Sequence, residues 1–238
     1  MQDTSSISNY DSIVASGDYS EEAKIVIDNV EYGEDQAWMA KTAIALFENR
    51  NPTIGLAQVR EIDVRIPYPL VTIPRTAEIR MYTRLIKGST KSGWLPKGVF
   101  YIDSRVKDED SEELSIHGYD AMLRAEADYP SSALAWTSTS PNARAVLNEI
   151  AAYMGVDLDD RTKAAIPTNT PYIVGFPAQY TIREVLGSIA AMYCGNFIMS
   201  DEGKLLLVGF NDLPEETRYL ITNSGNYITF GGYRILRY

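Results

Sequence analysis

The feature that most constrains the fold of this chain is a repeated alternation of apolar and polar residues in its first half. In residues 77–85, Ile79 and Leu85 fall on one face of a strand and Arg80 and Arg84 fall on the other. This two-residue period is typical of half-buried strands. Comparable strand signals lie at residues 24–28, 62–66, 98–102 and 114–118. Several such runs joined by short polar turns predict an antiparallel sheet or a small barrel.

The second half of the chain changes to a helical spacing of apolar residues. The first helix is expected over residues 141–154, where apolar side chains recur every three or four positions. Ser140 is suited to cap its start and Pro141 to occupy its first turn. Gly155 is suited to end it in a left-handed conformation.

A second helix is expected over residues 181–194. Thr181 and Glu184 have the spacing of a capping box, in which each side chain accepts a hydrogen bond from a backbone N–H group at the helix start. Gly195 is expected to end this helix. Residues 196–208 contain two apolar runs around a polar turn, which predicts a β-hairpin.

These signals together predict an α+β fold that is mainly antiparallel β. Residues 1–22 show no period and are expected to form an extended N-terminal arm. Residues 23–129 are expected to form a β-rich, barrel-like domain. Residues 130–238 are expected to form an α/β domain that contains both helices and the hairpin.

The ends of the two expected domains carry further signals. Asp120 is suited to cap a short helix over residues 119–126, ahead of a turn-rich linker. Near the C-terminus, a last pair of strands is expected around Gly231 and Gly232. The chain stops at Tyr238 directly after strand-like sequence, so we expect the C-terminal domain to be truncated.

The cysteine and histidine content narrows the chemistry that the chain can perform. Cys194 is the one cysteine, which excludes an internal disulfide and a thiolate zinc cluster. His117 is the one histidine, which excludes sites that need two imidazoles. No run approaches the roughly 20 apolar residues of a membrane span. The first twelve residues lack the basic and apolar regions of a signal peptide.

The net charge of −10 counts against tight binding of nucleic acid, which needs Lys and Arg to displace counterions. The charge is unevenly placed along the chain. Residues 1–35 hold nine acidic residues and one basic residue, whereas residues 60–105 hold nine basic and four acidic ones. This division predicts complementary surfaces, either within one chain or between copies, or simply two solvated faces.

Two groups of carboxylates were tested as metal ligands. The acidic run at residues 108–113 lacks the glycine that a calcium loop needs for its sharp turn, so we expect a solvated hairpin turn. Asp157, Asp159 and Asp160 fail the same test and are expected to start the turn after the first helix. No metal site is therefore assigned.

A nucleophilic site is not favoured by the sequence either. The G-x-S-x-G motif of serine hydrolases is absent, and any Ser-His-Asp triad would have to use His117. His117 is expected on the exposed face of its strand, opposite in phase to Ile116. Cys194 lies beside the end of the second helix and is expected to be a small buried residue rather than an activated thiolate.

Binding residues are likewise not assigned. Basic and aromatic residues alternate in the middle of the chain, at Arg65, Tyr68, Arg75, Arg80, Tyr82 and Arg84, a weak nucleic-acid signal. Given the net charge, the favoured interpretation is strand faces on which Arg serves solubility or pairs with acids. Trp38, Trp94 and Trp136 could line a sugar groove, but tryptophans this far apart are more typical of a core or an interface. No catalytic, cofactor-binding or metal-binding residue follows from the sequence.

One long run and three shorter segments resemble bacteriophage and prophage tail hub proteins, also called baseplate hub proteins. The long run is residues 180–205, which is similar to the helix-plus-hairpin unit of that family. The shorter segments are 51–55 (NPTIG), 98–105 (GVFYIDSR) and 114–129 (LSIHGYDAMLRAEADY). In order, the four cover residues 45–210.

The resemblance implies a structural role without an active site. Tail hubs are built of barrel-like domains with α/β insertions, and they assemble as a ring, commonly a trimer, that joins the tail tube to a spike and to other tail proteins. DNA passes along the axis without specific binding. The implied location is the virion tail, after assembly in the bacterial cytoplasm, with no cofactor. The alternative is a tail-associated enzyme or carbohydrate-binding module that acts on the bacterial envelope.

Overall fold

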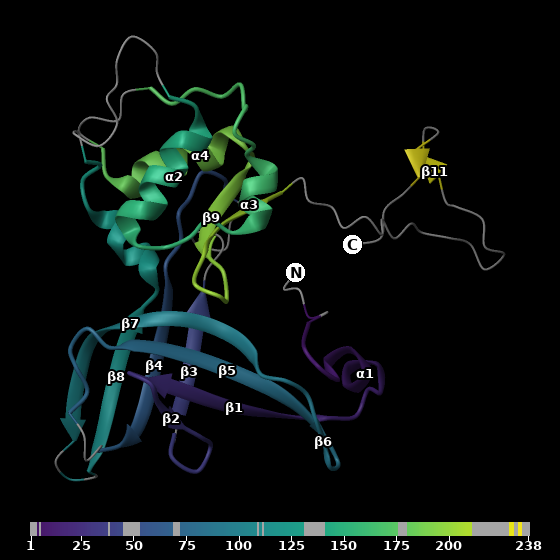
Figure 1. Cartoon of the computed structure of the whole chain (residues 1–238), viewed down its shortest axis with the longest axis vertical. Coiled ribbons are helices and arrows are strands. Elements are labelled where there is room, and N and C mark those ends of the chain that lie inside the picture. The colour runs from purple at the N-terminus through teal and green to yellow at the C-terminus, as the bar shows by residue number, and fades with distance from the viewer. Residues whose placement is uncertain are drawn as a thin grey trace.

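The computed structural model describes residues 4, 6–37, 39–44, 53–68, 72–108, 110, 112–130, 141–175 and 180–210, together with the backbone of residues 229–230 and 233–234. Figure 1 shows a curled sheet, with a group of helices and a β-hairpin beyond one of its ends. The buried apolar residues form two separate clusters, one in each of these parts.

The sheet contains eight strands, and all of its pairings are antiparallel. The strand order is β2-β1-β5-β7-β8-β4-β3, with β6 paired to β5. The strands are β1 (Ser20–Ile27), β2 (Val30–Tyr32), β3 (Met39–Ile44), β4 (Arg60–Pro67), β5 (Glu78–Lys87), β6 (Thr90–Lys91), β7 (Leu95–Asp108) and β8 (Glu113–Tyr119). The predicted α+β class with a mainly antiparallel sheet is confirmed.

The sheet curls but does not close. Its register shifts between Met81 and Tyr82 and again between Ile102 and Ser104, and such bulges increase the local bend and twist of a sheet. The two edge strands are β2 and β3, and no pairing joins them in the part of the chain that the structure describes. The three residues of β2 offer little edge for such a pairing. A closed barrel is therefore not found.

The sheet part holds one of the two apolar clusters, which we call the sheet core. It contains Ile25, Ile27, Ile62, Val64, Ile66, Ile73, Ala77, Ile79, Phe100, Leu114 and Ile116. The alternation predicted for β5 is confirmed, because Ile79 and Leu85 are buried while Arg80 is exposed and Arg84 half-buried. Burial of one face fixes the register of each strand, since a slip of one residue would expose the apolar side chains.

The helical part holds the second cluster, which we call the helical core. Its elements are the 3₁₀ helix η2 (Ala121–Glu126), α2 (Ala143–Met154), α3 (Asp160–Ala165), α4 (Ile182–Met192), β9 (Gly195–Met199) and β10 (Leu205–Gly209). The apolar stripes of α2 and α4 meet in it, and Phe197 of β9 is fully buried among them. The predicted hairpin is confirmed as β9 paired with β10. The predicted last strands appear as β11 (Thr229–Phe230) and β12 (Tyr233–Arg234).

The start of α2 differs from the expectation. Its N-cap is Asn142, whose side chain accepts a hydrogen bond from the N–H group of Ala145 at 3.0 Å. Ser140 lies outside the described residues, and Pro141 precedes the cap. The amide of Asn142 also donates to the carbonyl of Thr168 at 2.8 Å, and this tertiary contact favours Asn142 as the cap. At the other end, Gly155 adopts the predicted left-handed conformation, with φ 67°.

The two ends of α4 had different outcomes. The predicted capping box is confirmed, because Thr181 accepts from the backbone of Glu184 and Glu184 accepts from the backbone of Thr181. The helix ends at Met192, before the Gly195 that we expected to end it, and Cys194 takes a left-handed conformation with φ 51°. Gly195 instead begins β9, where a Cβ atom would lie 2.5 Å from the carbonyl oxygen of Val208.

Two extended segments flank the hairpin and join it to the rest of the helical core. Phe197 of β9 exchanges backbone hydrogen bonds with Leu56 and Gln58, each with an N···O distance of 2.8 Å. On the other side, Leu205 of β10 makes two backbone hydrogen bonds with the chain just before α3, at 2.8 and 3.0 Å. The hairpin is therefore the centre of a small sheet on which the helices pack.

The helix α4 approaches one of these segments very closely. A Cβ atom on Gly187 would lie 2.6 Å from the carbonyl oxygen of Gly55. Gly55 itself has φ 83°, a conformation that favours glycine, and a Cβ there would lie 3.1 Å from the Cβ of Ala191. The segment at residues 51–55, one of those that carry the family resemblance, thus ends at a point where backbone touches helix.

We expect Gly187→Ala to lower the free energy of unfolding by about 1 kcal/mol, although alanine normally stabilises a helix interior by a similar amount. The added methyl group would push α4 away from the Gly55 carbonyl. Urea unfolding followed by circular dichroism measures the change, and Ser188→Ala on the exposed face of α4 is the matched control. A Gly187→Ala protein that is more stable than the parent would contradict the close approach.

The N-terminal segment is not an extended arm throughout. Residues 10–15 form the helix α1 (Tyr10–Ala15), which the sequence did not predict, and residues 20–22 already belong to β1. Ile13 is buried, and the carbonyl of Ser8 accepts a hydrogen bond from Gly93 at 3.0 Å. Burial of this one apolar side chain against the sheet orders a segment whose sequence shows no period. The division into domains at residues 22 and 129 stays a prediction.

Candidate functional site

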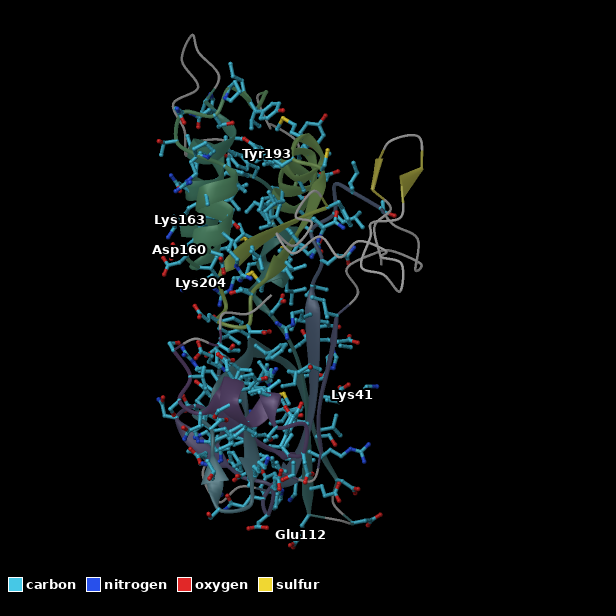
Figure 2. All side chains as sticks on the ribbon, turned by 90° about the vertical axis from the view of Figure 1, so that its right-hand side faces the viewer. Lys41, Glu112, Asp160, Lys163, Tyr193 and Lys204 are labelled. Atoms are coloured by element: carbon cyan, nitrogen blue, oxygen red, sulfur yellow. The ribbon has the colours of Figure 1, made fainter. Side chains whose placement is uncertain are left out.

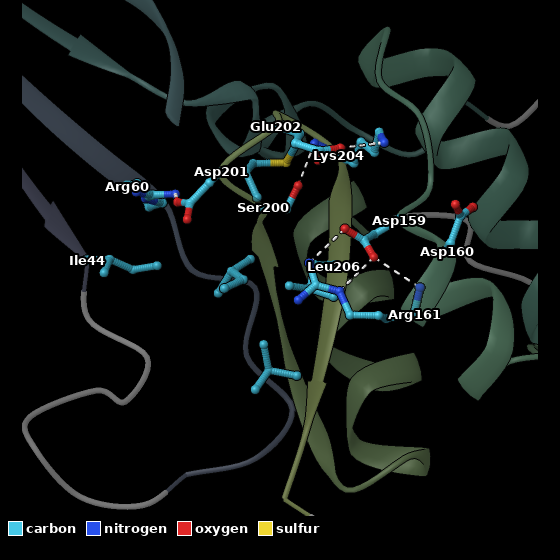
Figure 3. A pocket seen from close by; sticks show the side chains of 13 residues that line it. Ile44, Arg60, Asp159, Asp160, Arg161, Ser200, Asp201, Glu202, Lys204 and Leu206 are labelled. Carbon is cyan, nitrogen blue, oxygen red and sulfur yellow. Dashed lines mark hydrogen bonds and ion pairs between the residues drawn. The ribbon is translucent and has the colours of Figure 1, made fainter. Parts of the chain in front are cut away.

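A hollow among the described residues lies where the hairpin turn meets the sheet, and we call it the junction cleft. Its volume is about 570 Å³. The lining residues come from the ends of β3 and β4, the start of α3, and the hairpin: Ile44, Arg60, Asp159, Asp160, Arg161, Ile198, Met199, Ser200, Asp201, Glu202, Lys204, Leu206 and Val208. Figure 3 shows charged side chains on both sides of the cleft.

Arg60, the first residue of β4, joins the two sides of the cleft. One guanidinium NH2 group (Nη1) donates to the Asp201 carboxylate in the hairpin turn at 2.7 Å, and the other (Nη2) donates to the carbonyl of Lys97 at 2.7 Å. The guanidinium carbon also lies 5.7 Å from the centre of the Phe100 ring. The Nε atom is buried and has no hydrogen-bond partner among the described residues.

Asp159 lies on the opposite wall of the cleft, and its carboxylate is hydrogen-bonded to Arg161. Its carboxylate caps α3 by accepting the N–H of Arg161 at 3.0 Å, and it accepts two further hydrogen bonds from the Arg161 guanidinium at 2.9 Å. These side-chain hydrogen bonds hold the pKa of Asp159 below its ordinary value. Asp159 thus starts the turn into α3, as the sequence predicted.

The remaining charges of the cleft are also paired. Asp160 accepts a hydrogen bond from Lys163 at 2.7 Å, which lowers the pKa of Asp160. Glu202 pairs with Lys204 at 2.6 Å, which raises the pKa of Lys204. Figure 2 shows Asp160, Lys163 and Lys204 together at the end of the helical part nearest the sheet. Each carboxylate in the lining therefore has a cation of the same chain as its partner.

This pairing decides what chemistry the cleft can perform. A general acid at neutral pH needs a carboxyl group whose pKa is raised, and glycosidases set such a group beside a second carboxylate. The pKa values of Asp159 and Asp160 are shifted in the opposite direction. The geometry of the junction cleft is that of a charged seam between the sheet and the hairpin.

One carboxyl group does have a raised pKa, but its oxygens accept hydrogen bonds from backbone N–H groups. Asp120 is 2% exposed, and burial raises its pKa to about 6. Its two oxygens accept hydrogen bonds from the N–H groups of Met122 and Arg60, each at 3.0 Å. The Met122 contact is the cap that the sequence predicted for the short helix, here a 3₁₀ helix. The side chain lies beneath the joint between β4, β8 and η2, outside the lining of the cleft.

The structure places His117 beside a carboxylate rather than beside a nucleophile. Its Nδ1 atom lies 2.8 Å from the Asp63 carboxylate, and its ring meets Tyr119 edge-on. His117 occupies the half-buried face of β8 while Ile116 is buried, so the predicted phase is confirmed. Ser104 is its register partner on β7, but no hydrogen bond joins the two among the described residues.

Cys194 is exposed, which corrects the expectation of a small buried residue. The left-handed backbone at this position, with φ 51°, turns the chain from α4 into β9 and directs the side chain to solvent. His117 lies in the sheet, and its partners there are Asp63 and Tyr119. The structure therefore gives no support to a dyad of Cys194 and His117.

Two of the arginines singled out in the sequence, Arg80 and Arg84, pair with acids, as one part of the favoured interpretation predicted. The Arg84 guanidinium makes two hydrogen bonds of 2.8 Å with the Glu22 carboxylate, and Lys91 contacts the same carboxylate at 3.2 Å. Arg80 pairs with Glu78. The acidic N-terminal segment and the basic middle of the chain therefore meet, at least at Glu22 and Arg84, within one chain.

The remaining candidate binding residues from the sequence are the tryptophans and the acidic run at residues 108–113. Two cations lie against the ring of Trp94, with Lys24 Nζ at 4.5 Å and the Arg84 guanidinium carbon at 4.2 Å from its centre, so the ring has partners within the chain. Trp38 and Trp136 lie outside the described residues. Asp108 and Glu113 pair at the facing ends of β7 and β8, as the predicted hairpin requires, and Glu112 lies at the end of the sheet far from the cleft (Figure 2).

Metal-binding clusters and membrane-spanning helices are both absent from the described residues. No group of three or more His, Cys, Asp or Glu side chains there is placed to hold a metal ion. No helix in the same ranges combines the length and the apolar character that crossing a membrane requires.

Comparison with known proteins gives similarity in structure alone. No protein-family model and no curated protein sequence matches this chain. The prophage MuSo2 43 kDa tail protein from Shewanella oneidensis matches 86% of this chain with a TM-score of 0.51 and 12% identity. The fold is similar to that of a prophage tail protein. The match covers 58% of the Shewanella protein, so this chain spans less than two thirds of its length.

Two other tail proteins align more loosely. The tail protein from Neisseria meningitidis MC58 matches over 88% of this chain and 59% of its own, with 15% identity and a TM-score of 0.48. The prophage tail protein gp18 from Listeria monocytogenes EGD-e matches over 87% and 56%, with 10% identity and a TM-score of 0.42.

Proposed function

We propose that this chain is a structural component of a phage or prophage tail, within the hub of the tail tip or baseplate. The observation that carries the proposal is the similarity of its fold, over most of its length, to a prophage tail protein. The sequence resemblance of residues 45–210 to tail hub proteins points the same way. Its work in the virion tail is then to present rigid surfaces to neighbouring proteins after assembly in the bacterial cytoplasm.

The finer features of the proposal follow from the hub resemblance. The chain forms a homo-oligomeric ring, of which a trimer is the expected form, around the path of the DNA, and it joins the tail tube to the spike and to other tail proteins. The curled sheet and the helical core act as two domains, the first of them barrel-like. Because Glu22 and Arg84 are used within one chain, the contacts between copies are expected elsewhere on the surface.

The proposal includes the absence of catalysis. The support is that the charges lining the junction cleft are paired with one another, which leaves its carboxylates ionised rather than poised to donate a proton. Incubation of the purified chain with bacterial cell-wall glycan and peptide tests this point. Release of soluble fragments that a single substitution abolishes would overturn it in favour of an envelope-degrading enzyme.

The assembly role is tested in a phage or prophage that encodes the chain. We expect an epitope-tagged chain to co-purify with intact tails, and antibody-linked gold to label one end of the tail. Deletion of the gene should abolish complete tails, and expression from a plasmid should restore them. A tagged chain that remains wholly in the unassembled fraction, together with normal tails after deletion, would contradict the proposal.

A further inference from the structure

Two connections among the described residues join the sheet and the helical core. Of the described chain, residues 58–60 lead from the helical core into β4, and residues 119–121 lead from β8 into η2. These two connections lie side by side, because Arg60 and Asp120 exchange backbone and side-chain hydrogen bonds of 3.0 Å. Two adjacent connections at the ends of regular elements form the geometry of a hinge.

Arg124 of η2 contacts the sheet close to these two connections. Its guanidinium carbon lies 4.2 Å from the centre of the Tyr101 ring. Tyr101 is the register partner of Tyr119, the last residue of β8, so this contact sits at the hinge. It therefore adds a cation–ring contact to the joint, separate from the ion pair that Arg60 makes with the hairpin turn.

The hairpin turn at residues 200–204 supplies a contact of a different kind. It extends from the helical core down to the sheet, where Asp201 faces Arg60 (Figure 3). At Gly203, a Cβ atom would lie 3.0 Å from the Cβ of Val99 on β7, so the turn and the strand touch. Arg60 also donates to the carbonyl of Lys97, which ties the same side chain to β7.

The burial of the Arg60 side chain makes the loss of its contact with Asp201 costly. The Arg60 side chain is 11% exposed and that of Asp201 is 28% exposed. Loss of Asp201 would leave a nearly buried cation whose Nε atom already has no partner in the described part of the chain. Breaking a buried ion pair by removing one partner is costly, because the remaining charge stays out of water. Arg60 therefore depends on the Asp201 carboxylate, the ion-pair partner of its guanidinium, to offset its burial.

We propose that Arg60 and Asp201 form a latch that holds the helical core at one angle to the sheet, over a hinge at residues 58–60 and 119–121. The latch sets the relative orientation of the two apolar cores, and its release frees the hinge. The inference concerns the chain itself and does not depend on the proposed role in a phage tail.

Distance measurement between two spin labels tests the latch in the full chain. Cys194 is exposed and supplies one label in the helical part, and Val106→Cys, at a position 66% exposed on β7, supplies the second. The labelled parent should give one narrow distance distribution. Asp201→Ala should broaden it and add longer distances, with an unchanged far-ultraviolet circular dichroism spectrum because Asp201 lies in a turn.

Glu202→Ala is the matched control, because Glu202 is the next residue of the same turn and pairs with Lys204 inside it. Its distribution should superimpose on that of the parent. A distribution for Asp201→Ala that matches the parent would overturn the latch. So would equal broadening by Asp201→Ala and Glu202→Ala, which would show that the turn as a whole and not the ion pair fixes the angle. A parent that is already broad would overturn it as well.

Discussion

Gly98→Ala is expected to lower the free energy of unfolding by about 3 kcal/mol, although it adds only one methyl group. Gly98 has φ 149°, a conformation that residues with a Cβ rarely adopt. A Cβ atom there would also overlap Cε2 of the Phe100 ring and lie 2.5 Å from its Cζ. Phe100 is fully buried in the sheet core, so its ring cannot move aside without disturbing that core.

Denaturant unfolding measures this change, and Gly33→Ala is the control, because a Cβ atom at Gly33 would meet nothing within 4 Å. A double mutant resolves the cause. In a Phe100→Leu background the smaller side chain removes the ring that opposes the methyl group, so the further cost of Gly98→Ala should fall. If Gly98→Ala and Gly33→Ala have the same small effect, the packing of Phe100 over Gly98 is not as described.

The same glycine explains part of what the sequence could predict. Residues 98–105 form one of the segments that carry the tail hub resemblance, and their signal includes a glycine two positions before an aromatic residue. In the structure these two residues stack, with the ring lying over the position that lacks a Cβ. The alternation in β5 and the capping box of α4 were predictable for a related reason. Each is decided within one short segment, by burial of one face or by a three-residue spacing.

Elements decided by tertiary contact were not predictable. The helix α1 is held by the burial of Ile13, and nothing in the local pattern marks that side chain as buried. Ser140 and Asn142 are both residue types that cap helices well, and the start of α2 could have used either. The structure uses Asn142, whose side chain also donates a hydrogen bond to the carbonyl of Thr168. Cys194 takes the left-handed turn that Gly195 could also have taken, because Gly195 is needed against the backbone of β10.

The candidate site could not be predicted from the sequence, because its main partners lie far apart along the chain. Arg60 and Asp201 are 141 positions apart, so no motif or spacing could join them. Arg60 entered the sequence analysis only as one of the nine basic residues in the middle of the chain. The pairing of that basic region with acids was predictable from the net charge, whereas the particular partner that bridges sheet and hairpin was not.

The second large effect is expected from pH, through Asp120. Burial raises the pKa of Asp120 from 3.8 to about 6, against the opposing positive charges of Arg60 and Arg183. Between these two values the folded chain holds a proton that the unfolded chain has released, so the stability that Asp120 contributes falls as pH rises. The full change across this window is about 3 kcal/mol, from the energy of one pKa shift per unit.

Other groups oppose this trend, so the effect must be read as a difference. Pairing lowers the pKa values of Glu22, Asp159 and Asp160, and stability from such groups is lost as pH falls. Asp120→Asn removes the titration of Asp120 and keeps one acceptor for the cap. Its free energy of unfolding, measured in urea from about pH 4 to about pH 7, should fall behind the parent at the acidic end and recover relative to it at the neutral end.

The constant cost of turning an amide toward the Arg60 N–H group cancels from this comparison, because it is present at every pH. What remains is the proton that the buried carboxyl group binds at the joint between β4, β8 and η2. A parent-minus-variant difference that stays flat across the range would mean that Asp120 titrates at its ordinary value. The hydrogen bonds from the N–H groups of Met122 and Arg60, which favour the ionised carboxylate, would then offset the whole effect of burial.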